Sequence, residues 1–261
     1  MFRMPHTFAL LCLLSLTFSC MKSDSSSNPP GNTDEEARST MELLQLIKEQ
    51  TRDFTFNEYT FIQETIRMNK DGSVRDTTTW YEALRFPDRF RIDFGELENG
   101  NAVIYRNDSV YLFREGSLAK SKAEENELML LEGGICTHPV DTIRARMERQ
   151  GYDLSKFRTD YFRGEPVYVI GAEKGDSTSK QIWIHKEKLA TVRRLDPGEE
   201  RMVEAIFDDF VYQDGAWIET WVEFYIDGQL LQTERYRSIN TKPELEDALF
   251  DPNRFGEWNW H

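Results

Sequence analysis

The sequence predicts an α+β protein dominated by one large antiparallel sheet, with helices packed on one face of it. Three observations support this fold class. From residue 54 to residue 240, apolar and polar side chains alternate with a period of two in many short segments, which is typical of strands. The turns between the segments are short and polar, as in hairpins. Segments with helical periodicity are confined to the start, the middle and the end of the chain, so helices and strands do not alternate as they do in parallel sheets.

The first helix is predicted at residues 34–50. Thr33 and Glu36 have the spacing of a capping box, and Met41, Leu44 and Ile47 recur at helical spacing. Helices in the middle of the chain are predicted at 125–134 and at 139–154, with Pro139 in the first turn of the second. A last short helix is predicted at 243–250. Each of these helices has one apolar face to bury.

About ten strands are predicted, linked mostly by hairpins. The count is taken from eleven segments, which are 54–68, 73–86, 89–94, 101–107, 109–115, 161–174, 180–187, 189–196, 201–213, 216–227 and 229–240. Alternation places apolar residues on one common face of these strands. The members that define this face are Phe90, Ile92, Phe94, Ile182, Ile184, Val222, Phe224 and Ile226. The opposite face is mixed aromatic and charged, and we expect it to be solvated.

The first 20 residues resemble a bacterial lipoprotein signal. The apolar run 7–18 follows Arg3 and is too short to span a bilayer, which needs about 20 residues. It ends at Ser19-Cys20, which resembles a lipobox and implies cleavage before Cys20 and acylation of that cysteine. The alternative is an ordinary signal peptide with Cys20 incidental. We therefore expect a signal at 1–19, a flexible Ser- and Pro-rich tether at 20–33, and a single domain at 34–261.

Charge and cysteine content exclude several classes of function. The formal net charge of −14 disfavours nucleic-acid partners. If Cys12 leaves with the signal and Cys20 carries lipid, Cys136 has no intramolecular disulfide partner. Cys136 and His138 are two potential ligands and cannot close a zinc site. We expect neither a metal nor a cofactor.

The sequence contains no convincing catalytic motif, so we expect that the protein is not an enzyme. Glu219 and Glu223 share a predicted strand face, but four residues of strand separate them by about 13 Å. Paired carboxylates of glycosidases lie roughly 5 to 9.5 Å apart. Asp208 and Asp209 point to opposite faces of their strand. Neither a nucleophile elbow nor a phosphate-binding glycine loop is present.

The order of the predicted elements resembles the periplasmic lipoprotein-sorting family of the LolA and LolB type. The segments that carry the resemblance are EALRFPDRFRIDF (82–94), NAVIYRNDSVYLF (101–113), PVYVIGAEKGDSTSKQIWIHKEKLATVRRLD (166–196) and FDPNRF (250–255). The resemblance implies an unclosed β-barrel, whose curved sheet is covered on its concave face by helices. It also implies that the eight apolar residues named above line a cavity for acyl chains of lipids or lipoproteins.

The resemblance further implies an arginine near a proline that latches the helical lid. Arg85 is the nearest match and Arg89 is the alternative. A lipid anchor is typical of the receptor type, so Cys20 indicates a receptor-like or accessory member that meets a periplasmic carrier. Because Met21 is not aspartate, we expect anchoring in the outer membrane, facing the periplasm. The segment 125–134 could supply an exposed apolar loop; the alternative is a buried helix.

Two other functions remain open from the sequence. One is a sensor or adaptor that acts through a protein partner on the same scaffold. The other is a glycan-binding surface lipoprotein, in which Trp217, Trp221 and Tyr225 form a row on one exposed strand face. A row of aromatic side chains on a sheet also occurs as ordinary packing.

Overall fold

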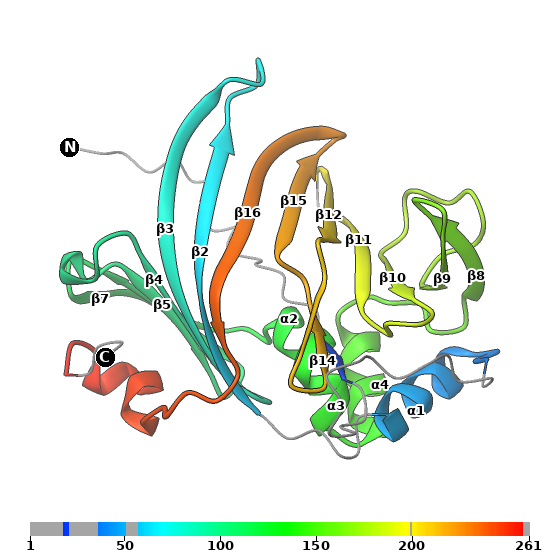
Figure 1. Cartoon of the computed structure of the whole chain (residues 1–261), viewed down its shortest axis with the longest axis horizontal. Helices are drawn as coiled ribbons and strands as arrows, with labels where there is room; N and C mark the ends of the chain where they lie inside the picture. Colours follow the sequence, from blue (N-terminus) through cyan, green and yellow to red (C-terminus); the bar gives the residue numbers. More distant parts are fainter. Residues whose placement is uncertain (1–17, 21–35, 51–56, 199, 258–261) are drawn as a thin grey trace.

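The computed structural model of the chain describes residues 18–20, 36–50, 57–198 and 200–257 (Figure 1). Within these residues, thirteen strands form one antiparallel sheet in the order β7-β6-β5-β4-β3-β2-β16-β15-β12-β11-β10-β9-β8. The strands are β2 (Glu58–Met68), β3 (Val74–Arg85), β4 (Arg89–Phe94), β5 (Ala102–Arg106), β6 (Ser109–Arg114), β7 (Ser117–Ala123), β8 (Phe157–Phe162), β9 (Glu165–Ile170), β10 (Gln181–His185), β11 (Thr191–Pro197), β12 (Met202–Asp208), β15 (Trp221–Ile226) and β16 (Gln229–Asn240). Because β7 and β8 are the two edges, the sheet is not closed, and the predicted fold class is confirmed.

The sheet consists of two meanders that β16 joins. Strands β2 to β7 run in chain order from the middle of the sheet to one edge, and β8 to β12 return from the other edge. Strand β16 pairs with β15 on one side and with β2 on the other, where Tyr236 lies opposite Gln63. The long strands β2, β3 and β16 arch over the helices (Figure 1). The centre of the sheet therefore depends on a contact between the beginning and the end of the domain.

A second, small sheet consists of β1 (Phe18–Cys20), β14 (Ala216–Ile218) and β13 (Val211–Gln213). The predicted strand 216–227 is thus divided, because β14 leaves for the small sheet and only β15 stays in the large one. Trp217 lies beside Tyr212, with 5.3 Å between ring centroids, and does not share a strand with Trp221 and Tyr225. The predicted three-ring row for glycans is therefore wrong.

The helices gather under the arch of the sheet (Figure 1). They are α1 (Thr40–Gln50), α2 (Glu127–Met129), the π-helical turn η3 (Leu130–Gly134), α3 (Ile135–Thr137) and α4 (Val140–Arg149). We call residues 127–149 the lid. Leu128, Met129, Leu130 and Leu131 are all buried, so the exposed-loop reading of this segment is wrong and the buried-helix reading is confirmed. None of the described helices is long and apolar enough to cross a membrane.

Helix α1 begins later than predicted. Ser39 Oγ accepts a hydrogen bond from the Glu42 backbone N–H at 3.2 Å, and the Glu42 carboxylate accepts one from the Arg38 N–H at 2.8 Å. This pair resembles a capping box, although the glutamate bonds the residue before the hydroxyl residue, and it lies six residues downstream of the pair that the sequence suggested. Of that pair, Thr33 lies outside the described residues. The predicted signal and tether also lie outside them, apart from residues 18–20.

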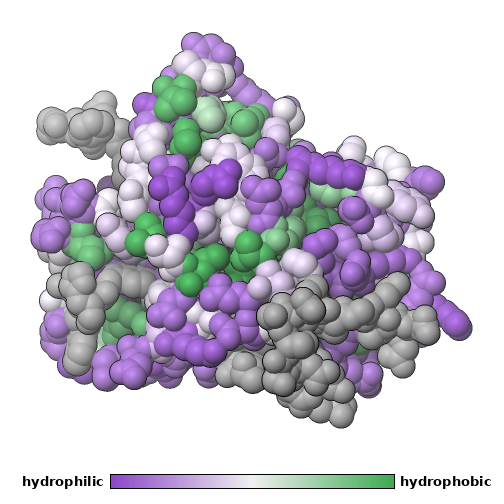
Figure 2. All heavy atoms as spheres, viewed as in Figure 1, coloured by the Kyte–Doolittle hydropathy of each residue, from purple (hydrophilic) through white to green (hydrophobic). Residues whose placement is uncertain are grey.

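The inner face of the sheet carries two apolar clusters. The first, the inner-face cluster, joins the middle strands to α2 and β14. Its buried members are Tyr59, Phe61, Trp80, Leu84, Phe86, Phe90, Ile92, Val103, Tyr105, Leu128, Met129, Ala205, Phe207, Ala216, Ile218, Val222, Phe224 and Tyr236. The second, the helix cluster, packs α1 and the lid against β9 and β10. Figure 2 shows apolar side chains gathered in the middle of the view and framed by hydrophilic ones.

The outer face of β3 to β6 is covered, contrary to the prediction of a solvated face. The C-terminal segment, with the 3₁₀-helical turns η4 (Asp247–Phe250) and η5 (Pro252–Arg254), packs on it. Beneath this segment, Arg91 forms ion pairs of 2.7 and 2.9 Å with Asp93. A further 3₁₀ turn, η2 (Leu97–Asn99), links β4 to β5. The alternation of charged residues in β4 is thus explained by a buried ion pair, which sequence periodicity cannot distinguish from solvent exposure.

Candidate functional site

The eight predicted cavity residues divide between the two clusters. Phe90, Ile92, Val222 and Phe224 belong to the inner-face cluster, and Phe94 packs against its border. Ile182 and Ile184 belong instead to the helix cluster. Ile226 is half-buried near the end of β15. The structure thus brings four of the eight together in one place, and their role in lipid binding stays a prediction.

The inner-face cluster is densely filled with aromatic rings. Tyr59 stacks on Phe61 and on Phe86, with ring centroids 5.6 and 6.0 Å apart, and Phe61 contacts Tyr236 at 4.5 Å. Trp80 meets Phe94 edge-on at 4.8 Å. Such pairs stabilise a core beyond their buried area. An acyl chain therefore needs these rings to change their packing, or the lid to move away from them.

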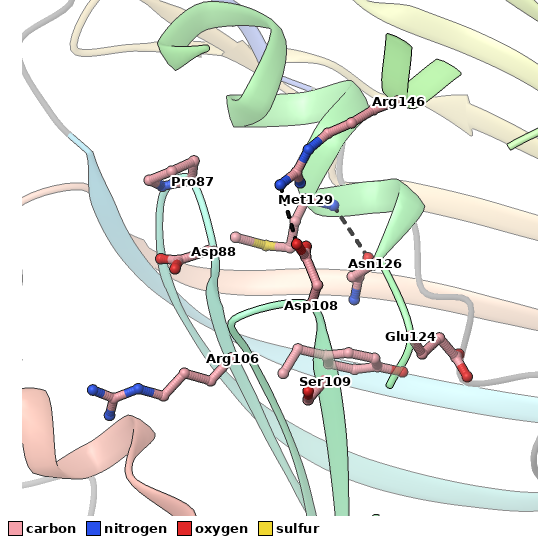
Figure 3. A pocket seen from close by; sticks show the side chains of 10 residues that line it. Pro87, Asp88, Arg106, Asp108, Ser109, Glu124, Asn126, Met129 and Arg146 are labelled. Carbon is pink, nitrogen blue, oxygen red and sulfur yellow. Dashed lines mark hydrogen bonds and ion pairs between the residues drawn. The ribbon is translucent and has the colours of Figure 1, made fainter. Parts of the chain in front are cut away.

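A shallow pocket lies where the lid meets the turns of the sheet (Figure 3). Its space is about 260 Å³, part of it open to solvent, and the enclosed part is too small for an acyl chain. Its lining residues are Pro87, Asp88, Tyr105, Arg106, Asp108, Ser109, Glu124, Asn126, Met129 and Arg146. Because Tyr105 and Met129 also belong to the inner-face cluster, this pocket adjoins its apolar interior.

Charged and polar side chains fasten the lid around this pocket. Arg146 of α4 pairs with Asp108 at 3.2 Å, as Figure 3 shows. Asn126 Oδ1 accepts hydrogen bonds from the backbone N–H groups of Leu128 and Met129 and so caps the start of the lid. On the far side, the Lys48 ammonium donates to the backbone carbonyls of Cys136 and His138. Helix α1 and the lid are thereby tied together.

The strongest tie between the lid and the sheet is centred on Glu127. Its carboxylate lies 2.9 Å from Lys180 Nζ and 3.8 Å from Arg194 NH1, and it accepts a hydrogen bond from Tyr152 at 2.6 Å. Burial opposes ionisation of Glu127, but Arg194, Lys180 and Tyr152 hold its pKa below the ordinary value. Burial, followed by the neighbouring Glu127, raises the pKa of Tyr152 well above its usual range.

Sequence reasoning missed Glu127, Lys180 and Arg194. Glu127 directly precedes the apolar run Leu128–Leu131, and Arg194 follows Val192 on the same face of its strand. A charged residue at a position where the periodicity expects an apolar one was the available signal. That signal could not show which charged residue elsewhere in the chain it would contact.

The two predicted latch residues lie on the outer face. Arg85 pairs with Glu58 at 2.7 Å and with Asp247 at 3.2 Å, and it donates to the Leu245 carbonyl. Arg89 also binds Asp247. Both side chains therefore hold the C-terminal segment, on the side of the sheet opposite to the lid. Their role as a latch remains a prediction, and the segment that they would fasten is the C-terminal segment.

We expect Arg85→Leu to loosen the C-terminal segment with a modest loss of stability, about 1 kcal/mol, because Asp247 is more than half exposed. Faster amide exchange in residues 245–250, at unchanged exchange in the lid, is the expected readout. If Arg85→Leu also changes the rate at which bound lipid exchanges, the latch acts through this segment. An unchanged lipid exchange rate would remove Arg85 from the site.

A second polar feature on the inner face was also missed. Gln63, Glu82, Gln232 and Glu234 lie on adjacent strands among the apolar residues and are almost completely buried. Burial raises the pKa of Glu234 to about 8, and burial together with nearby Glu234 raises that of Glu82 well above its ordinary value. The signal in the sequence was a glutamate in phase with apolar residues, as in Trp80, Glu82 and Leu84.

Among the described residues, no group of three or more His, Cys, Asp or Glu side chains is arranged to hold a metal ion.

The sequence matches no protein-family model and no curated protein. Solved structures are similar in fold. A LolA superfamily protein from Nitrosomonas europaea has a TM-score of 0.55 at 12% identity, over 83% of this chain and 99% of that one. A DUF1329 family protein from Desulfovibrio piger has a TM-score of 0.55 at 16% identity, over 82% and 97%. An outer membrane lipoprotein-sorting protein domain from Vibrio parahaemolyticus has a TM-score of 0.55 at 14% identity, over 82% and 96%. The fold resemblance inferred from the sequence is confirmed.

Proposed function

Starting from this LolA-like fold, we propose that the chain is a lipid-anchored protein of the bacterial envelope that binds acyl chains of lipids or lipoproteins on the inner face of its sheet and passes them on. The observation that carries the proposal is the large apolar cluster on the inner face of the sheet, closed by a short lid that buried charges hold in place. The chemistry at this face is binding, and the proposal assigns no catalytic step.

The energetics suit transfer between a protein and a membrane. A chain of some 15 buried CH₂ groups gains roughly 12 kcal/mol, and a bilayer offers about the same. A transfer protein must therefore match the bilayer and not exceed it. The aromatic rings of the inner-face cluster fill the closed protein, and we propose that the acyl chain replaces their mutual contacts when the lid opens.

Native mass spectrometry tests the binding. The chain from residue 20 onward, carrying Cys20→Ser, is expected to copurify with acyl species. Val222→Trp places a large side chain at a fully buried inner-face position and is expected to remove them, with folding checked by circular dichroism. Val211→Trp, at an exposed position, is the matched control. An acyl-free wild-type mass, together with no uptake of added fluorescent fatty probes, would contradict the proposal.

Attachment through Cys20 gives a separate prediction. In the structure of the full chain, Cys136 is disulfide-bonded, and Cys12 and Cys20 are the other cysteines. The proposed processing would remove both as disulfide partners for Cys136. Cys12 would leave with the signal, and the Cys20 sulfur would carry lipid. We therefore expect the disulfide in the unprocessed chain alone, and a reduced Cys136 in the anchored protein.

We expect Cys20→Ser to abolish incorporation of labelled fatty acid and to move the protein out of the membrane fraction after processing. Cys12→Ser, a matched change in the same N-terminal segment, should leave both unchanged. Retained labelling in Cys20→Ser would show that Cys20 is incidental, as in the ordinary signal-peptide reading.

A further inference from the structure

An island of hydrogen-bond acceptors lies within the apolar inner face. Gln63 of β2, Glu82 of β3, and Gln232 and Glu234 of β16 have relative exposures of 0%, 0%, 1% and 0%. Their strands are adjacent in the order β3-β2-β16. We call these four residues the acceptor island.

Apolar side chains surround the acceptor island. Across the neighbouring strands, Glu82 lies opposite Phe61 and Ile92, Glu234 lies opposite Val222, and Gln232 lies opposite Phe224. All four of these apolar residues belong to the inner-face cluster, which is the proposed acyl-chain site. A ligand that binds there can therefore reach the island without leaving the apolar face.

The hydrogen bonds within the island leave four of its acceptor oxygens without a partner. Gln63 Nε2 donates to Thr65 Oγ1 at 2.8 Å, and Gln232 Nε2 donates to Glu234 Oε1 at 2.6 Å. Tyr236 donates its hydroxyl to Glu234 Oε2 at 3.2 Å. Both carboxyl oxygens of Glu82, and the amide oxygens of Gln63 and Gln232, have no hydrogen-bond partner among the described residues. Leaving buried polar atoms without a partner costs about 1–3 kcal/mol each.

The nearest cation of this face is already engaged. Arg67 of β2 pairs with Asp76 of β3 at 2.8 Å and lies over the Trp80 ring at 5.5 Å. Arg67 and Asp76 together contribute no net charge, so two ionised glutamates would leave an excess of two negative charges at the island. The complementary group is a cation that has donors and no acceptors, as a primary ammonium does.

We infer that the acceptor island binds the ammonium group of a cationic amphiphile, a single-chain or double-chain primary amine whose hydrocarbon part lies on the neighbouring aromatic and aliphatic residues. This inference rests on the proposed function and specifies the chemical class of its ligand. The ammonium donates to Glu82 and to the amide oxygen of Gln63 on the adjacent strand, while Glu234 supplies a second negative charge. Gln232 lies opposite Arg67, about 20 Å along the sheet from the level of Glu82, and contributes through its hydrogen bond to Glu234. An anionic amphiphile of the same chain length is disfavoured, since its negative charge would be buried beside two glutamates without a cation of its own.

The inference also predicts a pH dependence. In the free protein burial raises the pKa of Glu234 to about 8, and burial together with Glu234 raises the pKa of Glu82, so both carboxyl groups resist ionisation. Binding of an ammonium favours their ionised form and releases protons. Affinity for the amine should therefore increase as the pH rises from 6 to 9, whereas affinity for a neutral alcohol should not. Arg67, Asp76 and Tyr236 face the same site; burial opposes ionisation of Asp76, but Arg75 and Arg67 hold its pKa below the ordinary value.

The test is displacement of a bound fluorescent fatty probe by three competitors of equal chain length: a fatty amine, a fatty alcohol and a fatty acid. The protein is the chain from residue 20 onward with Cys20→Ser. We expect the amine to compete at a concentration about tenfold or more below that of the alcohol, as for a charge-assisted hydrogen bond, and the acid to be the weakest. The double variant Glu82→Gln/Glu234→Gln should lose the preference and its pH dependence, with alcohol binding kept.

Glu64→Gln is the matched control, because Glu64 lies on β2 but pairs with Arg237 on the outer face. It should keep the preference for the amine. Equal displacement by amine and alcohol at pH 6 and pH 9 would overturn the inference and leave the proposed function standing. Failure of the fluorescent probe to bind at all would overturn the proposed function, and the inference with it.

Discussion

Replacing Glu127 by glutamine is expected to destabilise the protein by about 3–5 kcal/mol, because it removes the negative charge from a buried network that holds Lys180 and Arg194. Lys180 would keep its ion pair with Asp196 at 2.9 Å, so the loss is concentrated on Arg194 and on the Tyr152 hydroxyl. The midpoint of denaturant unfolding measures the effect. Amide exchange should accelerate first in residues 127–137, since Glu127 ties the lid to the sheet.

Glu125→Gln is the control for this experiment. Glu125 precedes Glu127 by two residues and pairs with Arg149 at 2.5 Å, but this pair is exposed to solvent. Its removal should cost less than about 1 kcal/mol. If the two variants lose the same stability, then burial of the Glu127 network does not hold the lid.

The pH dependence of Glu127 has a definite sign. Its folded-state pKa is lowered, so the stability it contributes is present above its unfolded value of 4.5 and is lost as the pH falls through the folded value. We therefore expect the lid to open at acid pH before the sheet unfolds.

The second large effect is a loss of stability as the pH rises above 4.5. Glu82 and Glu234 have raised pKa values in the folded protein, so the folded state binds more protons than the unfolded state above pH 4.5. The contribution of each group to stability is fully present below pH 4.5 and is lost as the pH rises through its folded value, which is about 8 for Glu234. The expected slope is about 1.4 kcal/mol per pH unit for each group.

Unfolding midpoints measured from pH 5 to pH 8 test this slope. Glu82→Gln should remove about half of the decline and should be more stable than the wild type at pH 8, because a neutral amide replaces a carboxyl group that is costly to ionise when buried. Glu64→Gln on the outer face should leave the slope unchanged. A wild-type stability that does not fall between pH 5 and pH 8 would mean that the two carboxyl groups are solvated or otherwise compensated.

Much of the strand pattern was predictable because alternation is a local property. The segments 54–68, 73–86 and 89–94 became β2, β3 and β4, and Phe90 and Ile92 face inward as predicted. The helix boundaries were less accurate. A capping box needs only a hydroxyl residue three positions before a glutamate, and the segment 33–42 contains two such pairs. Which pair caps α1 depends on where the helix can pack.

The binding site was only partly predictable. Ile182 and Ile184 were grouped with Phe90 from their strand parity, but the curvature of the sheet places them under α1 and the lid, in another cluster. The alternation of residues along a strand specifies the face on which a side chain lies. It does not specify which helix packs against that side chain. The predicted exposed aromatic row at 217–225 was also wrong. The strand is interrupted at Glu219 and Thr220, and β14 pairs in the small sheet.

The sequence by itself determined the periodicities of this protein, and with them the antiparallel sheet, its two faces and the grouping of the helices, because these follow from the local geometry of the backbone. Only the tertiary structure decided which charges meet. The pairing of β16 with β2 brings Glu234 and Gln63 together on adjacent strands with Glu82, and the fold of the lid carries Glu127 to Arg194. Such encounters depend on the register and curvature of distant segments, which no local pattern encodes.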